Sequence, residues 1–199
     1  MKRKLFPLTF FFVLLFTALT AYGQTCGIHC GTERWRVKTL TDTTVGNINS
    51  TEVTKTINQL RVIPHPANLP ANTRKNNSIE TKTIKVIGVV MTFKKESNDN
   101  DFHVVIANPN NHAQTMIVEF PDPGCDHVCS SGFLQRMQQA RADFIAKFGQ
   151  PTTSFQDQAN PISVEIVGIG FFDRDHGQRG RAQPSIAEIH PVLGFRALQ

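Results

Sequence analysis

The chain has 199 residues, with 21 lysines and arginines against 16 aspartates and glutamates, and a formal net charge of +5. Three of the cations, Lys2, Arg3 and Lys4, precede an apolar run, so the chain from residue 24 onward carries a net charge of only +2. This near balance excludes overall basicity as an argument for a nucleic-acid-binding protein.

The first 23 residues have the organisation of a secretory signal peptide. The positive start is followed by a run rich in Leu and Phe (5–21), and Ala21 and Gly23 are the small residues before a cleavage site at Gln24. We therefore predict cleavage near Gly23 and a secreted or periplasmic mature protein that has no transmembrane segment. An uncleaved membrane anchor is the alternative, and the shortness of the apolar run argues against it.

Four cysteines lie in the exported part as two C-x3-C pairs: Cys26, Cys30, Cys125 and Cys129. In an oxidising compartment an even number of cysteines predicts two disulfides. We expect the N-terminal pair to bridge to the second pair and so to staple the N-terminus to the domain body. Zinc is the alternative, because each pair encloses a histidine and the spacing fits zinc ligands.

Residues 24–82 are predicted to form an irregular N-terminal extension. Residues 33–40 are compatible with one short strand, and Ser50 is a candidate cap for a short helix that carries Val53, Ile57 and Leu60. Three prolines between residues 64 and 70 then predict a long loop.

From residue 83 onward the side-chain pattern predicts five strands and one helix. The expected strands are residues 83–94, 102–106, 115–120, 162–172 and 186–195. The helix is expected after Ser130 or Ser131, with apolar residues at helical spacing, and it should end before Gly149. A loop rich in Gly, Arg and Gln (173–185) joins the last two strands.

Three strands, a helix and two strands are the chain order of the five-stranded OB barrel, whose helix lies between the third and fourth strands. We therefore predict a mainly β (α+β) protein with an OB-like barrel over residues 83–199 and the irregular extension 24–82. A small α+β sheet with one packed helix is the alternative.

Two histidines and two glutamates are candidates for a metal site. His103 and Glu119 point away from the apolar faces of the second and third strands, and a hairpin turn at residues 108–112 would place them opposite each other. Glu188 and His190 share one face of the fifth strand. Because these three strands are neighbours in an OB barrel, we expect the four side chains to converge, either as ordinary cross-strand contacts or around one divalent metal ion.

Basic residues surround the two loops that frame the ligand face of an OB domain. They are Lys94, Lys95, Arg174, His176, Arg179 and Arg181. Because arginine offers a planar fork of donors to carboxylates and phosphates, this rim predicts an anionic ligand. A solvated surface, partly neutralised by neighbouring aspartates, is the alternative.

Several longer blocks cover most of the chain between residues 33 and 193. They are ERWRVKT (33–39), HVVI (103–106), MIVEFPDPGC (116–125), GIGFFDRDHGQRG (168–180) and IAEIHPVL (186–193). In these blocks the chain resembles a family of uncharacterised exported bacterial proteins. The resemblance implies export and a single domain, and it carries over no catalytic residue.

The leading interpretation is an exported binding module without a cofactor. Its ligand would be an anionic polysaccharide, a nucleic acid or an acidic protein surface. The alternative is a metal-dependent, nuclease-like hydrolase that uses the His/Glu cluster, and a structural envelope protein is a third interpretation. The sequence contains neither a G-x-S-x-G elbow nor an H-E-x-x-H pair, so it supplies no catalytic motif.

Overall fold

The computed structural model describes residue 27 and residues 29–198. The predicted signal peptide and Cys26 lie outside the described residues. Within them, no helix combines the length and the apolar character that crossing a membrane requires.

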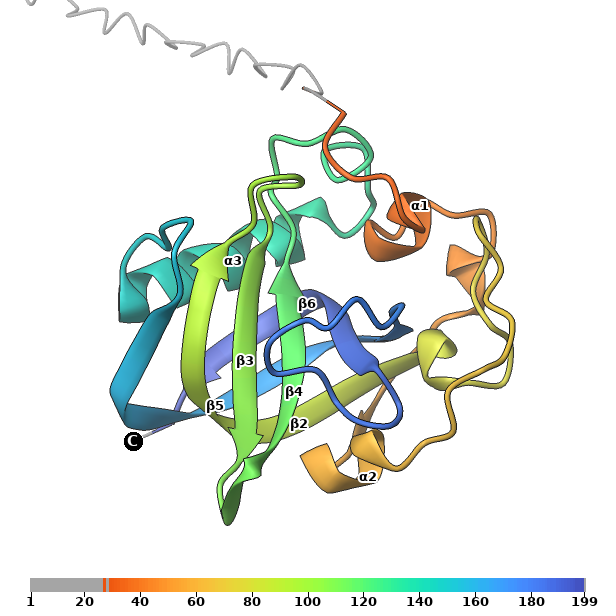
Figure 1. Cartoon of the computed structure of the whole chain (residues 1–199). Coiled ribbons are helices and arrows are strands. Elements are labelled where there is room, and N and C mark those ends of the chain that lie inside the picture. The colour runs from red at the N-terminus through yellow and green to blue at the C-terminus, as the bar shows by residue number, and fades with distance from the viewer. Residues whose placement is uncertain (1–26, 28, 199) are drawn as a thin grey trace, which may run out of the picture.

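Six strands in the described part of the chain form one mixed sheet. They are β1 (Asn49–Thr54), β2 (Lys82–Lys95), β3 (Phe102–Asn108), β4 (Asn111–Phe120), β5 (Gln156–Phe172) and β6 (Ala187–Ala197). Neighbouring strands follow the order β1-β2-β3-β4-β6-β5, and β2 also pairs with β5. The five strands from β2 to β6 therefore close into a ring (Figure 1).

Within this ring only the β4–β6 pairing is parallel among the described strands. The five strands predicted from sequence are confirmed, and their bounds agree except that several observed strands extend beyond the predicted ends. Apolar residues alternate into the ring, as at Val104 and Ile106 of β3 and at Met116 and Val118 of β4, and all four are buried in the main core cluster. The period-2 pattern of these strands thus reflects one face turned into the core.

The main helix, α3 (Leu134–Phe148), packs against the ring. The side chain of Phe144 lies 5.0–5.9 Å, between ring centroids, from four phenylalanines of the strands: Phe93, Phe102, Phe120 and Phe195. The helix lies between β4 and β5 in the chain, as predicted. Its first turn begins at Leu134, three residues after Ser131, whose hydroxyl accepts a hydrogen bond from the Phe133 amide at 3.3 Å.

The N-terminal extension is more ordered than the sequence predicted. The strand expected within residues 33–40 is wrong, because this segment contains the short helix α1 (Trp35–Lys38). The prediction of a helix that begins at Ser50 is also wrong. Residues 49–54 form β1, parallel to β2, and the helix α2 (Ile57–Arg61) starts later, capped by Thr56. Two 3-10 turns, Val45–Asn47 and Ile79–Thr81, complete the segment.

A disulfide between Cys30 and Cys125 ties the N-terminal segment to the chain that follows β4. This bond confirms the predicted link between the two cysteine pairs, and Cys129 is disulfide-bonded as well. Oxidised cysteines exclude the alternative of a zinc site made of thiolates. The disulfide is compatible with export, because such bonds persist in oxidising compartments.

Candidate functional site

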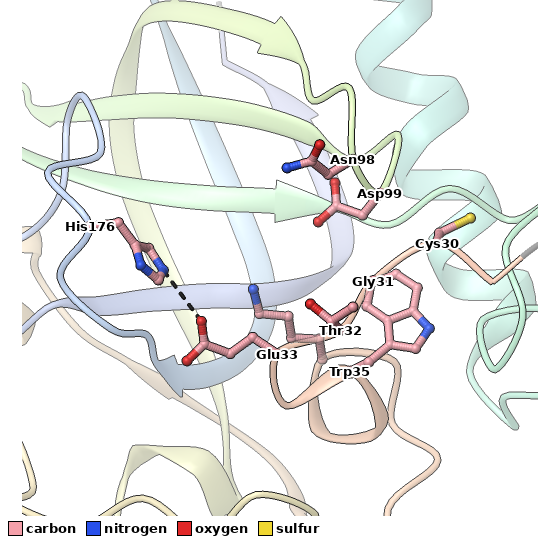
Figure 2. Close-up of a pocket in the computed structure, with 9 residues that line it drawn as sticks. Cys30, Gly31, Thr32, Glu33, Trp35, Asn98, Asp99 and His176 are labelled. Atoms are coloured by element: carbon pink, nitrogen blue, oxygen red, sulfur yellow. Dashed lines mark ion pairs between the residues drawn. The ribbon is translucent and has the colours of Figure 1, made fainter.

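A cavity of about 450 Å³ lies where the N-terminal segment meets two loops of the ring. Its lining residues are Cys30, Gly31, Thr32, Glu33, Trp35, Lys38, Asn98, Asp99 and His176. Asn98 and Asp99 belong to the β2–β3 loop, and His176 belongs to the β5–β6 loop. Figure 2 shows Asp99, His176 and Glu33 around this common space.

The wall formed by the N-terminal segment is fixed from three directions. The Cys30–Cys125 disulfide holds its start. The indole nitrogen of Trp35 donates a hydrogen bond to Asp126 Oδ1 at 2.9 Å. Arg34 forms a bidentate ion pair with the buried Glu80, with N–O distances of 2.5 and 2.8 Å. This wall is therefore part of the rigid body of the domain.

Lys38 supplies a nearly buried ammonium to the cavity, with a side chain that is 12% exposed. Its Nζ lies 3.7 Å from Asp173 Oδ1, which is its one ion-pair contact among the described residues, and 5.4 Å from the centroid of the Phe171 ring. Burial alone would lower the pKa of Lys38, but nearby carboxylates, Asp173 first among them, outweigh burial and raise the pKa above its ordinary value. The group is therefore a permanent positive charge.

Asp99, which lines the cavity, and the buried Glu188 of β6 both have a raised pKa. Burial raises the pKa of Asp99 to about 7, and the negative charges of Asp101 and Glu119 add to the effect. Burial also raises the pKa of Glu188 well above its ordinary value, assisted by Asp173 and Glu119. Glu188 is 2% exposed, and its Oε2 atom has no hydrogen-bond partner among the described residues. In both groups, burial and neighbouring carboxylates therefore favour the protonated form.

Three of the four predicted metal-site residues are in contact. Glu119 Oε1 lies 3.0 Å from His103 Nδ1, and Glu119 Oε2 lies 3.2 Å from His190 Nδ1. The other nitrogen of each ring is also engaged, since His103 Nε2 lies 3.0 Å from the Arg179 carbonyl oxygen and His190 Nε2 lies 3.3 Å from Asp101 Oδ2. The result is a buried polar chain that runs from Asp101 to the β5–β6 loop. The charge of Glu119 in turn helps to raise the pKa of Glu188, the fourth predicted residue.

In this buried polar chain of side chains, the glutamate and the two histidines each favour the charged form of the other. Burial would raise the pKa of Glu119, but hydrogen bonds from His103 and His190 outweigh burial and lower it well below its ordinary value. Burial would likewise lower the pKa of both histidines, but their contacts with the carboxylates raise it. The folded state thus favours an ionised glutamate between two protonated imidazoles.

A second group of possible metal ligands lies at the mouth of the cavity. His176 Nε2 lies 3.4 Å from Glu33 Oε2 and 3.7 Å from Asp173 Oδ2. Figure 2 marks the contact between His176 and Glu33. Gln178 Nε2 donates a hydrogen bond to Asp173 Oδ2 at 2.8 Å, and Arg174 Nε lies 2.6 Å from Glu33 Oε1.

The basic residues predicted to bind an anion are mostly paired with acids of the same domain. Lys94 lies 2.9 Å from Glu96, and Arg174 and His176 both contact Glu33. Arg179 lies 2.9 Å from Asp157, and Arg181 lies 2.9 Å from Asp175. Lys95 ends β2, and its backbone amide donates to the Thr152 carbonyl oxygen. Of the six basic residues predicted from sequence, only His176 lines the cavity.

Sequence reasoning missed Glu33, Trp35, Lys38, Asp99 and Asp173 as site residues. Glu33 and Lys38 lie in the ERWRVKT block, to which no catalytic or binding role attaches, and Asp99 lies in a stretch typical of a polar turn. Only contacts between segments that are distant in sequence bring them together. Comparison of the chain with protein-family models, curated proteins and solved structures gave no match.

Proposed function

We propose that this protein is an exported binding module built on an OB-like barrel, with the cavity beside Lys38 as its ligand site. The strand order of the ring, the parallel β4–β6 pairing and the helix between β4 and β5 support the OB-like assignment. The signal-peptide pattern of residues 1–23 and the Cys30–Cys125 disulfide support export to the periplasm or beyond the cell.

The position of the cavity is the first support for this function. OB domains commonly bind ligands on the face of their second and third strands, between the loop joining strands one and two and the loop joining strands four and five. Here these loops are β2–β3 and β5–β6, and both line the cavity through Asn98, Asp99 and His176.

The β5–β6 loop restricts the size of the ligand. It lies across the outer face of β3, where the Arg179 carbonyl contacts His103 and a methyl group at Gly180 would overlap the side chain of Val105 (Figure 1). An extended polymer strand therefore has no open groove along β3. The cavity at the end of this face suits a small molecule or the end group of a larger one.

The position of the Lys38 ammonium is the single observation that indicates the chemical class of the ligand. Its ammonium is protonated, lines the cavity and has only one ion-pair contact, at 3.7 Å, among the described residues. An ammonium has three donors, so it can donate to an incoming oxygen anion. The ligand is therefore expected to carry a carboxylate or phosphate group, consistent with the anionic ligand expected from sequence.

Trp35 makes this proposal directly testable, because it is the only tryptophan of the chain and it lines the cavity. We expect glucuronate, inorganic phosphate or a nucleoside monophosphate to change its fluorescence on titration with the mature protein. Lys38→Met should abolish the change, whereas Lys147→Met, on the outer surface of α3, should keep it. Equal responses of the two variants, or no response to any probe, would contradict the proposal.

A metal-dependent hydrolase is the second candidate function. The observation that favours it is Asp99, whose pKa of about 7 suits a general acid or base at neutral pH. Hydrolysis of a chromogenic phosphodiester should then be lost with a chelator and in Asp99→Asn. Turnover that survives both treatments would exclude this assignment.

A further inference from the structure

The mouth of the cavity has the composition and spacing of a transition-metal site. We propose that Glu33 Oε2, Asp173 Oδ2 and His176 Nε2 bind one Zn²⁺ ion, with a fourth coordination position open to the cavity. This inference deepens the proposed function and rests on it, because the ion would present a second positive charge beside Lys38 to the anionic ligand.

The distances between the three ligand atoms support tetrahedral coordination. Zinc bonds to nitrogen and oxygen of about 2.0–2.1 Å place the ligand atoms of a tetrahedron about 3.3–3.4 Å apart. The observed separations from His176 Nε2 are 3.4 Å to Glu33 and 3.7 Å to Asp173, and one ligand atom from each of the three residues fits within 4.8 Å. Both separations measured from His176 Nε2 are thus close to the tetrahedral value.

The burial of Asp173 is a second observation, independent of the spacing. Asp173 is only 5% exposed, and among the described residues its Oδ1 atom has no hydrogen bond and only the Lys38 ammonium, at 3.7 Å. A divalent ion bound to Asp173 would give this buried carboxylate a closer positive partner than Lys38.

The surrounding residues suit a site of the open, three-ligand kind. Gln178 donates to Asp173 Oδ2 at 2.8 Å, and its own carbonyl accepts from the His176 amide at 2.9 Å, so one side chain orients two of the ligands. The side chains of His176 and Glu33 are 50% and 24% exposed, which gives the ion a route from solvent.

The buried group Asp101, Glu119 and His190 is the weaker candidate, although its ligand atoms also lie within 4.8 Å of one another. Both nitrogens of His190 already face carboxylates, and its side chain is fully buried. A metal ion would therefore have to replace these contacts inside the core, with no route from solvent through the His190 side chain.

A substitution of Arg174 distinguishes zinc binding from direct binding of an anion by the β5–β6 loop. Its guanidinium lies 2.6 Å from Glu33 Oε1 and is 73% exposed. If zinc binds Glu33, then Arg174→Gln should tighten zinc binding, because it removes a competing positive charge. If the arginine itself binds the ligand, the same variant should weaken ligand binding without affecting zinc.

The test is calorimetric titration of the chelator-treated mature protein with Zn²⁺, supported by the absorption spectrum with Co²⁺. We expect one ion per chain and a tetrahedral cobalt spectrum. His176→Gln should weaken binding by about 100-fold or more, and Gln178→Ala by about 10–100-fold, the usual effect of an outer partner. His112→Gln, an exposed histidine at the start of β4, should bind like the parent.

Binding that persists in His176→Gln, equal losses in His176→Gln and His112→Gln, or no retained zinc at all would overturn the proposal. Circular dichroism of each variant checks that the fold is intact, which is expected because His176 is exposed. The titration contains no organic ligand, so its failure is separate from that of the Lys38-dependent fluorescence change.

Discussion

His103 on β3 is the direct cross-strand neighbour of Glu119 on β4, and the two side chains meet with Nδ1 and Oε1 3.0 Å apart. Both are buried although they point out of the ring, because the β5–β6 loop covers them. A polar pair on an outer sheet face has thus become the point at which a loop is fixed to the sheet.

Replacing His103 should therefore loosen the β5–β6 loop. His103→Ala removes the contact with the Arg179 carbonyl and leaves Glu119 with one partner fewer, so we expect a loss of about 1–3 kcal/mol in the free energy of unfolding. Urea unfolding measures the loss, and faster hydrogen exchange in residues 174–185 locates it. His112→Ala should change stability by less than about 0.5 kcal/mol; an equal loss there would contradict the assignment.

Two glycines of the same loop provide a matched pair of substitutions. Gly177 and Gly180 have φ values of +79° and +88°, but only Gly180 packs against a side chain, that of Val105. Gly177→Ala should cost about 1–2 kcal/mol from backbone conformation alone, and Gly180→Ala should cost more. Adding Val105→Ala should recover part of the extra loss in Gly180→Ala. If both glycine variants have the same thermal stability, the loop does not pack on β3 as described.

Glu80 should be one of the residues most sensitive to substitution. Its buried carboxylate pairs with Arg34 and accepts hydrogen bonds from the amides of Phe172, away from solvent, and of the part-buried Lys75. Glu80→Ala leaves the Arg34 charge buried and unpaired, which should cost about 3–5 kcal/mol in chemical unfolding.

The matched control for Glu80 is Glu165, whose pair with Arg196 lies at the surface. Glu165→Ala should cost about 0–1 kcal/mol, the usual value of an exposed ion pair. Similar losses in the two variants would show that the buried pair contributes no more than the surface pair.

The raised pKa of Asp99 makes stability depend on pH in a defined direction. The unfolded chain ionises Asp99 near its ordinary pKa, whereas the folded protein holds the proton up to about pH 7. The unfolded state therefore binds fewer protons between these values, and Asp99 lowers stability as the pH rises from about 4 to about 7. In Asp99→Asn this contribution is absent. Urea unfolding at several pH values should show a shallower decline for the variant, and parallel curves would rule out this role.

The strands from β2 to β6 could be predicted because each has a face that is buried in the core. Val104, Ile106, Met116 and Val118 make this face visible as an alternating pattern. β1 could not be predicted this way, because all six of its side chains are exposed and the strand is held by backbone pairing with β2. The capping box of Thr56 and Gln59, which starts α2, was a local signal that the prediction overlooked.

The candidate site, like the fold, could be predicted from sequence only where a local pattern exists. The pairing of His103 with Glu119 followed from strand register, which period-2 alternation and one turn are enough to predict. The cavity depends instead on a covalent link over 95 residues and on the buried pair of Arg34 with Glu80. Lys38 and Asp173 lie in two separate sequence blocks that no spacing rule links, so their proximity could be seen only in three dimensions.

The Cys30–Cys125 disulfide also sets an order of events during biogenesis. Cys30 is synthesised 95 residues before its partner, so the segment with Glu33, Trp35 and Lys38 is tethered only after β2, β3 and β4 have been made. A reduced chain lacks the covalent anchor of this wall. Completion of the cavity is thus coupled to the thiol chemistry of the compartment in which the chain folds.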